Sequence, residues 1–354
     1  MKLLQTYLGR TIIFSTLLVI LAVLALETFV NFVSETKYIG QGDYGVTQAF
    51  VYVLWGLPQE IYNLFPMMAM LGVIVGLGNL AAHHELMVYR TSGLSVQQIT
   101  GMVIKTVVLM IVIITLIGVF LAPAMVHWAQ RQKSSAMSGG QAITTLEGTW
   151  LKNGNTFIHV AAILPGGHLK GVTRYTFSAN HQLEKVSFAE EANYDNHHWR
   201  LQQIVESRFY PDHIEKVAIA SENINMALNP VFIHAAEEEP RELTLPKLFK
   251  FIRYQELNGL HANEYWLVFW QRLMQPIASL VMIFLAIPCM FGPLRSATIG
   301  LRMIFGVAIG FSFYIVNSFF GPMTVVYQIP PLLAATLPSL LFLLAGIWMM
   351  RRVR

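Results

Sequence analysis

The sequence predicts an α-helical polytopic membrane protein, with six transmembrane helices in two groups of three and an all-β domain inserted between the groups. Of its 354 residues, 55% are hydrophobic and 12% are charged, whereas soluble domains carry about 25% charged residues. Apolar runs longer than about 18 residues recur along the chain. A polar stretch, residues 134–262, interrupts these runs and holds 14 of the 20 acidic residues. These observations exclude a soluble globular enzyme, a disordered chain and a fibrous repeat.

Six stretches are long enough to span a membrane, which takes about 20 apolar residues. They cover approximately residues 11–33, 57–82, 99–130, 262–291, 301–320 and 331–350. The first stretch continues in apolar residues at Phe29, which favours an uncleaved span over a cleaved signal peptide. The last two stretches share a charge-free run, residues 303–350, which Gly321-Pro322 and Pro330-Pro331 are expected to divide because proline breaks helices.

Basic residues concentrate on one side of this six-span map. That side carries Lys2, Arg10, Arg90, Arg295, Arg302, Arg351, Arg352 and Arg354. Because cytoplasmic loops are rich in Lys and Arg, both termini are predicted to be cytoplasmic and the polar stretch to lie outside the cell membrane. We therefore assign the net charge of +4 to membrane orientation and anionic lipid rather than to nucleic acid.

The polar stretch has the pattern of short β-strands. Residues 149–152 and 156–160 flank Asn153-Gly154-Asn155, which is a hairpin signal. Further strand-like runs follow at 169–177, 183–193, 198–209 and 214–220, and a helix is expected near 246–257. This spacing predicts a sandwich or jelly roll. The predicted domains are residues 1–133 with the first three spans, 134–245 with the β domain, and 246–354 with the connecting helix and the last three spans.

Several stretches, taken together, resemble one protein family. They are Glu85-Leu86, Arg90-Thr91-Ser92-Gly93, Phe291-Gly292-Pro293-Leu294-Arg295-Ser296, residues 306–314, Gly321-Pro322 and Tyr327-Gln328-Ile329-Pro330-Pro331. In order, spacing and topology, the whole chain resembles the LptF/LptG permeases of the lipopolysaccharide export system. Gly40-Gln41-Gly42 and residues 148–154 are more similar to the LptG branch of that family.

The resemblance implies a permease subunit of an ATP-driven (ABC) exporter in the bacterial inner membrane, with its jelly-roll domain in the periplasm. Such an exporter extracts lipopolysaccharide and passes it to a periplasmic bridge protein toward the outer membrane. The implied partners are an LptF-type permease in a heterodimer, an LptB-type ATPase dimer and an LptC-type subunit with a single helix. ATP and Mg are expected at the partner ATPase and no cofactor in this chain.

The chain itself is expected not to be an enzyme. It contains no GxxxxGK[ST] phosphate-binding motif. A metal site is also not expected, because Cys289 is the single cysteine and the adjacent His197 and His198 would point to opposite faces of a strand.

The loop between the second and third spans is the first candidate site. Leu86, Tyr89 and Arg90 lie at helical spacing from Glu85 or from each other, which predicts a short helix near 82–93 that ends near Gly93. By the resemblance, this is the coupling helix that meets the ATPase, with Glu85 as its central polar contact. Periodicity alone also allows an ordinary solvated loop helix.

A second candidate site would bind lipopolysaccharide, whose phosphates and acyl chains call for cations near the outer surface and apolar walls. The cationic candidates are Lys37, Arg131, Lys133 and Arg272. The first three could instead be interfacial side chains that extend toward the headgroups. Arg272 lies inside a span and could instead pair with Glu264 or Glu27.

The first and fifth spans are the lateral gate that the family implies. The candidate wall residues are Phe29, Phe32, Phe311 and Phe319. Such an aromatic stripe could also face lipid or serve packing alone. Gly306 and Gly310 have a spacing that permits close helix contact, either within this chain or with a partner permease.

Other functions remain open from the residues alone. The β domain could make the chain a scaffold or sensor, or the chain could be another lipid-handling ABC permease. A membrane enzyme acting on lipid headgroups would need a cluster of ionisable residues at one membrane face, which the spans do not supply. Lipoprotein-extracting permeases have four spans, unlike the two groups of three here.

Overall fold

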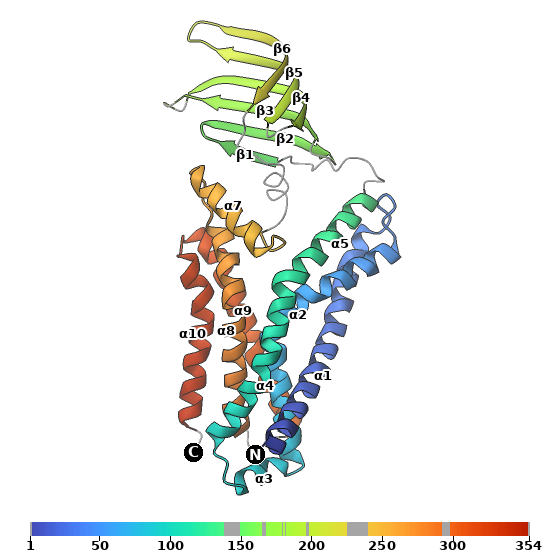
Figure 1. Ribbon diagram of the computed structural model, residues 1–354, viewed down its shortest axis with the longest axis vertical. Helices are drawn as coiled ribbons and strands as arrows, with labels where there is room; N and C mark the ends of the chain where they lie inside the picture. The colour runs from blue at the N-terminus through green and yellow to red at the C-terminus, as the bar shows by residue number, and fades with distance from the viewer. Residues whose placement is uncertain are drawn as a thin grey trace. The chain divides into compact units, whose positions relative to one another are not determined.

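The computed structural model describes residues 2–137, 149–164, 168–178, 180, 182–195, 198–224, 240–291 and 298–352. The chain forms two compact units (Figure 1). One is helical and comprises Met1–Lys37, Ala49–Ala129 and Asn263–Arg354, and the other, Tyr38–Gln48 and Gln130–Ala262, contains the sheet. Within the described residues, six helices are long and apolar enough to cross a membrane, so the predicted fold class is confirmed. Gly148 and residues 292–296, on which the resemblance partly rests, lie outside the described residues.

The six spans are continuous helices, most of them longer than the apolar runs. The elements are α1 (Lys2–Glu35), α2 (Val46–Ala82), α3 (Glu85–Thr91), α4 (Val96–Leu116), η2 (Ile117–Leu121), α5 (Ala122–Met137), α8 (Asn263–Phe291), α9 (Ile299–Val326) and α10 (Pro331–Arg351). The third span runs through α4, η2 and α5, and η2 is a π-helical turn. Pro123 follows this turn and has no N–H to donate to the preceding turn, which accounts for the local irregularity. Gly118 lies in the same turn, where an added Cβ would overlap the Tyr62 ring of α2.

One predicted helix break is wrong. Helix α9 continues through Gly321-Pro322 and ends at Val326. A proline removes one backbone hydrogen bond, and transmembrane helices tolerate this because neighbouring groups compensate. The break at Pro330-Pro331 is confirmed, because Pro331 opens α10 at a position where a backbone N–H needs no helical partner.

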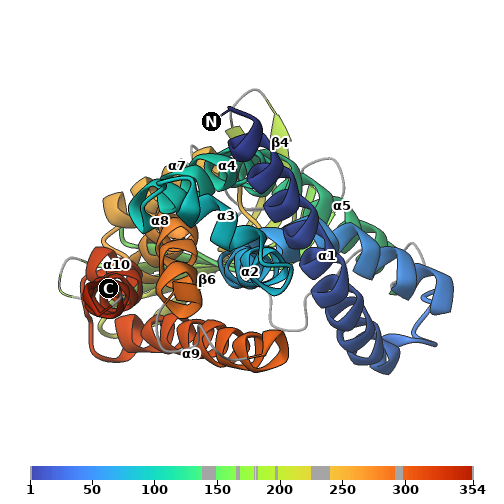
Figure 2. The ribbon, with the colours of Figure 1, turned by 90° about the horizontal axis from the view of Figure 1, so that it is seen from below.

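Helix α2 is the central element of the helical unit. In the most apolar part of each span, 72% of the α2 segment is buried inside the protein, compared with 28% of the α1 segment and 17% of the α9 segment. Both α1 and α9 pack against α2 (Figure 2): Gly72 faces Thr16 of α1, and Gly310 faces Met67. The close contact that Gly310 permits is therefore made within the chain.

In its described residues, the β domain is built from one antiparallel sheet whose six strands follow each other in chain order. The strands are β1 (Thr149–Asn153), β2 (Thr156–Leu164), β3 (His168–Phe177), β4 (Leu183–Asp195), β5 (His198–Phe209) and β6 (Ile214–Ile224). The predicted hairpin is confirmed, and Gly154 at its tip has φ +59°. The predicted inserted β domain is confirmed as well, but the strands described between residues 149 and 224 form a single sheet without the second sheet of a jelly roll.

The second unit also contains η1 (Thr36–Tyr38) in part and α7 (Leu245–Leu257), the predicted connecting helix. The Tyr254 hydroxyl of α7 donates a 2.8 Å hydrogen bond to the carbonyl of Lys152 in β1. This contact fixes the helix to the first strand of the sheet.

Strands β3, β4 and β5 bend at the same position along the sheet. Beside this bend, Val172 of β3 pairs with Ala189 of β4, and Ala189 pairs with Ile204 of β5. The pairing register between the strands is the same before and after the bend. The alternation of buried residues shifts by one position there, because Leu201 and Ile204, three residues apart, are both buried. Gly171 supplies the bend on β3 with φ +66°, at a point where an added Cβ would lie 2.9 Å from Cβ of Ala161. The sheet is therefore curled around one buried face.

Candidate functional site

The loop between α2 and α4 contains the predicted short helix, α3. The helix is followed by Gly93, whose φ of +86° turns the chain back. The backbone N–H of Leu94 then bonds the Tyr89 carbonyl at 3.2 Å. Ser95 and Gln98 form a reciprocal capping box that starts α4. The local sequence thus specifies a separate short helix in the connection between α2 and α4.

Helix α3 has an inner and an outer face. Leu86 and Tyr89 pack inward, and Tyr89 is only 2% exposed. Met87 and Val88 are 62% and 54% exposed on the outer face. Arg90 belongs to the helix, and its side chain is not among the described ones. The sequence prediction emphasised Leu86 and Tyr89 and missed Met87 and Val88, because periodicity gives the spacing of a face but not which face is inward.

Two tyrosines link α3 to the first turns of α1. The Tyr89 hydroxyl donates a 2.9 Å hydrogen bond to the Leu4 carbonyl, and the Tyr7 hydroxyl lies near the Glu85 carboxylate. Burial, with added effects of Tyr7 and Glu85, raises the pKa of Tyr89, so its hydroxyl remains a donor at neutral pH. Oε2 of Glu85 is buried and has no hydrogen-bond partner among the described residues.

The three predicted interfacial cations have different surroundings. Lys37 lies exposed in η1, and Arg131 lies exposed on α5. Lys133 is half-buried, with its Nζ 4.0 Å from the centroid of the Tyr38 ring and 5.8 Å from that of Tyr44. This is cation–π geometry. Lys133 is thus held by the segment that follows α1.

Arg272 lies inside the packing of the helical unit. It is 7% exposed, and its backbone carbonyl accepts a 2.9 Å hydrogen bond from the Tyr62 hydroxyl of α2. Glu27, one of its proposed partners, accepts a 3.5 Å hydrogen bond from Asn31. Arg272 is therefore placed at the contact between α2 and α8 rather than on an exposed wall of this chain.

The predicted aromatic wall residues are mostly exposed. Phe29 of α1 is 66% exposed, and Phe311 and Phe319 of α9 are 58% and 62% exposed. Phe32 is half-buried and packs edge-to-face on Phe50, with ring centroids 6.1 Å apart. Helix α1 packs on α2 and α4, and α9 packs on α2, α8 and α10. Each of the two helices also has an apolar face that the described residues of this chain leave uncovered.

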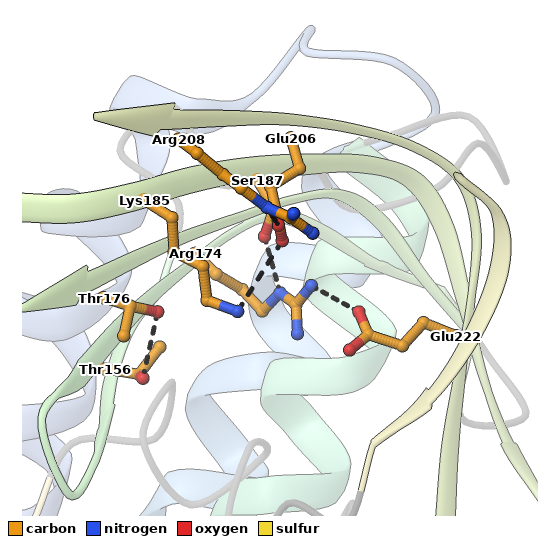
Figure 3. A network of polar contacts seen from close by, with 8 residues as sticks. All are labelled: Thr156, Arg174, Thr176, Lys185, Ser187, Glu206, Arg208 and Glu222. Carbon is orange, nitrogen blue, oxygen red and sulfur yellow. Dashed lines mark hydrogen bonds and ion pairs between the residues drawn. The ribbon is translucent and has the colours of Figure 1, made fainter. Parts of the chain in front are cut away.

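A charged cluster on the inner face of the curled sheet was not predicted from the sequence. It consists of Arg174, Lys185, Ser187, Glu206, Arg208 and Glu222 (Figure 3). Arg174 of β3 donates to Ser187 at 2.8 Å and pairs with Glu222 at 2.7 Å. Since Glu222 lies on β6, three strands from β3, this pair joins two non-adjacent strands across the inside of the curl.

Glu206 is the buried carboxylate of this cluster, 2% exposed. Its Oε1 accepts a 2.8 Å hydrogen bond from Arg208, and its Oε2 lies 3.7 Å from the Lys185 ammonium. Burial by itself would raise the pKa of Glu206, but the Arg208 hydrogen bond and the charges of Lys185, Arg208 and Arg174 outweigh it, so the pKa is lowered. Strand alternation from buried Ile204 to Glu206 was the available signal for this inward carboxylate.

Comparison with known proteins gives a match along nearly the whole chain. The family model described as lipopolysaccharide export system permease LptF/LptG matches residues 6–352. The lipopolysaccharide export system permease protein LptG of Escherichia coli (strain K12) is 34% identical over 352 residues, 99% of this chain and 98% of that protein. The protein of the same description from Haemophilus influenzae (strain ATCC 51907 / DSM 11121 / KW20 / Rd) is 32% identical over 353 residues, 99% of each chain. The matches include both groups of helices and the inserted sheet.

Proposed function

Because the chain belongs to the LptF/LptG family of lipopolysaccharide export permeases, we propose specific roles in that export for α3, α1 and α9. The chain is a permease subunit of the lipopolysaccharide exporter and a multi-pass protein of the inner membrane. The family match over residues 6–352 is the observation that carries this conclusion.

Helix α3 is the coupling helix that meets an LptB-type ATPase dimer, where ATP and Mg bind. Its exposed Met87 and Val88 form the apolar part of the contact, as in other complexes where a helix docks in a groove. Glu85 supplies the polar part, because it lies in the first turn of the helix and its side chain is only half-buried. A cation on the ATPase fits this carboxylate. Leu86 and Tyr89 hold the helix from inside, and Arg90 belongs to the same contact.

Helices α1 and α9 line the path of the substrate. Their uncovered apolar faces, with Phe29, Phe32, Phe311 and Phe319, suit the acyl chains of lipopolysaccharide. Their low burial in this chain supports an LptF-type permease as the second wall of the path. Lys37, Arg131 and Lys133 are proposed to attract the phosphates, and Arg272 adds charge behind the wall. An LptC-type subunit associates with this assembly.

The cytoplasmic side is proposed to be the end of the helical unit that contains α3. The start of α1 and the end of α10 lie at that same end (Figure 1). The β domain then belongs to the periplasm, where lipopolysaccharide passes to the bridge protein.

Photocrosslinking tests this path. A photoreactive amino acid at Phe311 or Phe319 should crosslink lipopolysaccharide in an ATP-dependent manner. The matched control is Leu344 of α10, which is 56% exposed and apolar but on another helix. Equal crosslinking at all three positions, or none at Phe311 and Phe319, would contradict the assignment of α9.

A further inference from the structure

The inner face of α3 is fixed to α1 by contacts between residues far apart in the chain. Tyr89 and Leu4 are 85 positions apart, and the 2.9 Å hydrogen bond between them joins the fifth residue of α3 to the first turn of α1. A helix carbonyl has two lone pairs, so Leu4 can accept this bond in addition to that of its own helix. The Tyr7 hydroxyl, one turn further along α1, lies near the Glu85 carboxylate of α3.

The position of α3 depends on these contacts. A helix of seven residues is not stable by itself in water, so tertiary packing has to hold it. The Tyr89 ring is among the largest fully buried side chains of the protein, and Leu86 packs on the same core. Packing therefore buries the inner face of α3, and the hydrogen bond of the Tyr89 hydroxyl fixes its direction relative to α1.

Helix α1 is suited to carry a displacement across the membrane. It runs without interruption from Lys2 to Glu35 and contains no proline, whereas α2, α8, α9 and α10 contain internal prolines and α4 leads into a π-helical turn. Thirty-four residues extend about 50 Å at about 1.5 Å per residue. Phe29, on the uncovered apolar face, lies near the far end of this rod from Leu4 and Tyr7.

We propose that Tyr89 and Tyr7 are positioning residues that make α3 and the start of α1 move as one body, so that ATP hydrolysis moves the substrate-facing helix. This inference rests on the proposed coupling role of α3 and the proposed path along α1. The competing route for the movement is the covalent connection of α3 to α2 and α4, which needs neither hydroxyl.

The test uses the full exporter, reconstituted in vesicles with lipopolysaccharide, with Tyr89→Phe, Tyr7→Phe and the double variant in this chain. Each variant removes a hydroxyl and keeps the ring. Tyr254→Phe is the matched control, because its hydroxyl also donates to a backbone carbonyl, at 2.8 Å, but in the β domain. Three quantities are measured: co-purified ATPase, the rate of ATP hydrolysis, and the lipopolysaccharide released per ATP hydrolysed.

Tyr89→Phe should keep the co-purified ATPase and the hydrolysis rate within about twofold. It should lower the lipopolysaccharide released per ATP about fivefold, which corresponds to about 1 kcal/mol, the usual net contribution of one hydrogen bond. The control variant, Tyr254→Phe, should release as much lipopolysaccharide per ATP hydrolysed as the unmodified protein. A ratio that Tyr89→Phe and the double variant leave unchanged would overturn the inference. If the unmodified chain does not bind the ATPase at all, the proposed function is refuted and the inference with it.

A distance measurement provides a second readout that does not depend on transport. Spin labels at the exposed positions Thr91 of α3 and Phe14 of α1 report how the two helices move, after the single native cysteine, Cys289, is replaced by serine. Their distance distribution should stay narrow during ATP turnover and broaden in the double tyrosine variant. A distribution that is broad already in the unmodified protein, or equally narrow in both, contradicts a rigid link through the hydroxyls.

Discussion

Replacing Glu206 with glutamine keeps the shape of the side chain and removes the negative charge from the buried face of the sheet. A hydrogen bond to a charged group contributes about 1.5–3 kcal/mol. The lower end applies here, because the side chains of Arg208 and Lys185 are 42% and 38% exposed and can be solvated when the charge is lost. We therefore expect Glu206→Gln to destabilise the local structure of β4 and β5 by about 1.5 kcal/mol.

The pH dependence of this difference follows from the lowered pKa of Glu206. A carboxyl whose pKa is lower in the folded than in the unfolded state stabilises fully above the unfolded value, here 4.5. The stabilisation is lost as the pH falls through the lower, folded value. The unmodified protein and Glu206→Gln should therefore differ fully at neutral pH and converge in acid below pH 4.5.

Hydrogen exchange of the purified full-length protein, followed by mass spectrometry of peptides from β4 and β5, measures this effect. A loss of about 1.4 kcal/mol corresponds to about tenfold faster exchange where opening is local. Glu184→Gln is the matched control, because Glu184 is an exposed carboxylate on β4. In this variant, the hydrogen exchange of β4 and β5 should equal that of the unmodified protein. Equal exchange in both variants at neutral pH, or a difference that grows in acid after correction for the intrinsic rate, would refute the reasoning about Glu206.

Three further changes test other parts of the account. Val88→Glu places a charge on the outer face of α3 and should lower co-purified ATPase at least tenfold without loss of membrane insertion; retained binding would contradict the docking face. Gly171→Ala should destabilise the β domain by about 1–3 kcal/mol, measured by thermal unfolding, because of the positive φ and the 2.9 Å approach to Ala161; an unchanged melting temperature would argue against the bend. Gly310→Leu would overlap Met67 and separate α9 from α2, so the yield of monodisperse protein on size exclusion should fall; a normal yield would mean that the two helices repack freely.

The fold was predictable where one strong local signal acts alone. Long apolar runs have no alternative to a spanning helix, since every backbone polar group in lipid must be bonded within its own segment. The Asn153-Gly154-Asn155 turn was equally clear, because glycine readily adopts the positive φ that its tip requires. Pro322 was misleading, since its usual helix-breaking effect in water is weaker in a membrane helix.

The short helix of the candidate site was predictable in location, but not which of its faces points inward. Residues 82–93 were recognised as a helix, yet tertiary packing decides that Tyr89 faces inward and Val88 outward. The pairing of Arg174 with Glu222 could not be predicted either, because it depends on the curl that brings β3 close to β6. Arg272 is similar, since the sequence shows that it lies within a span but not that α2 covers it.

The central claim is that this chain is a permease subunit whose partner ATPase drives lipopolysaccharide out of the membrane. The most direct measurement is the amount of lipopolysaccharide that moves from vesicles to a soluble periplasmic acceptor. The vesicles contain this chain, its LptF-type partner and the ATPase, with an LptC-type subunit present. We predict release that requires both ATP and this chain. Release that is the same without the chain, or the same without ATP, would contradict the account.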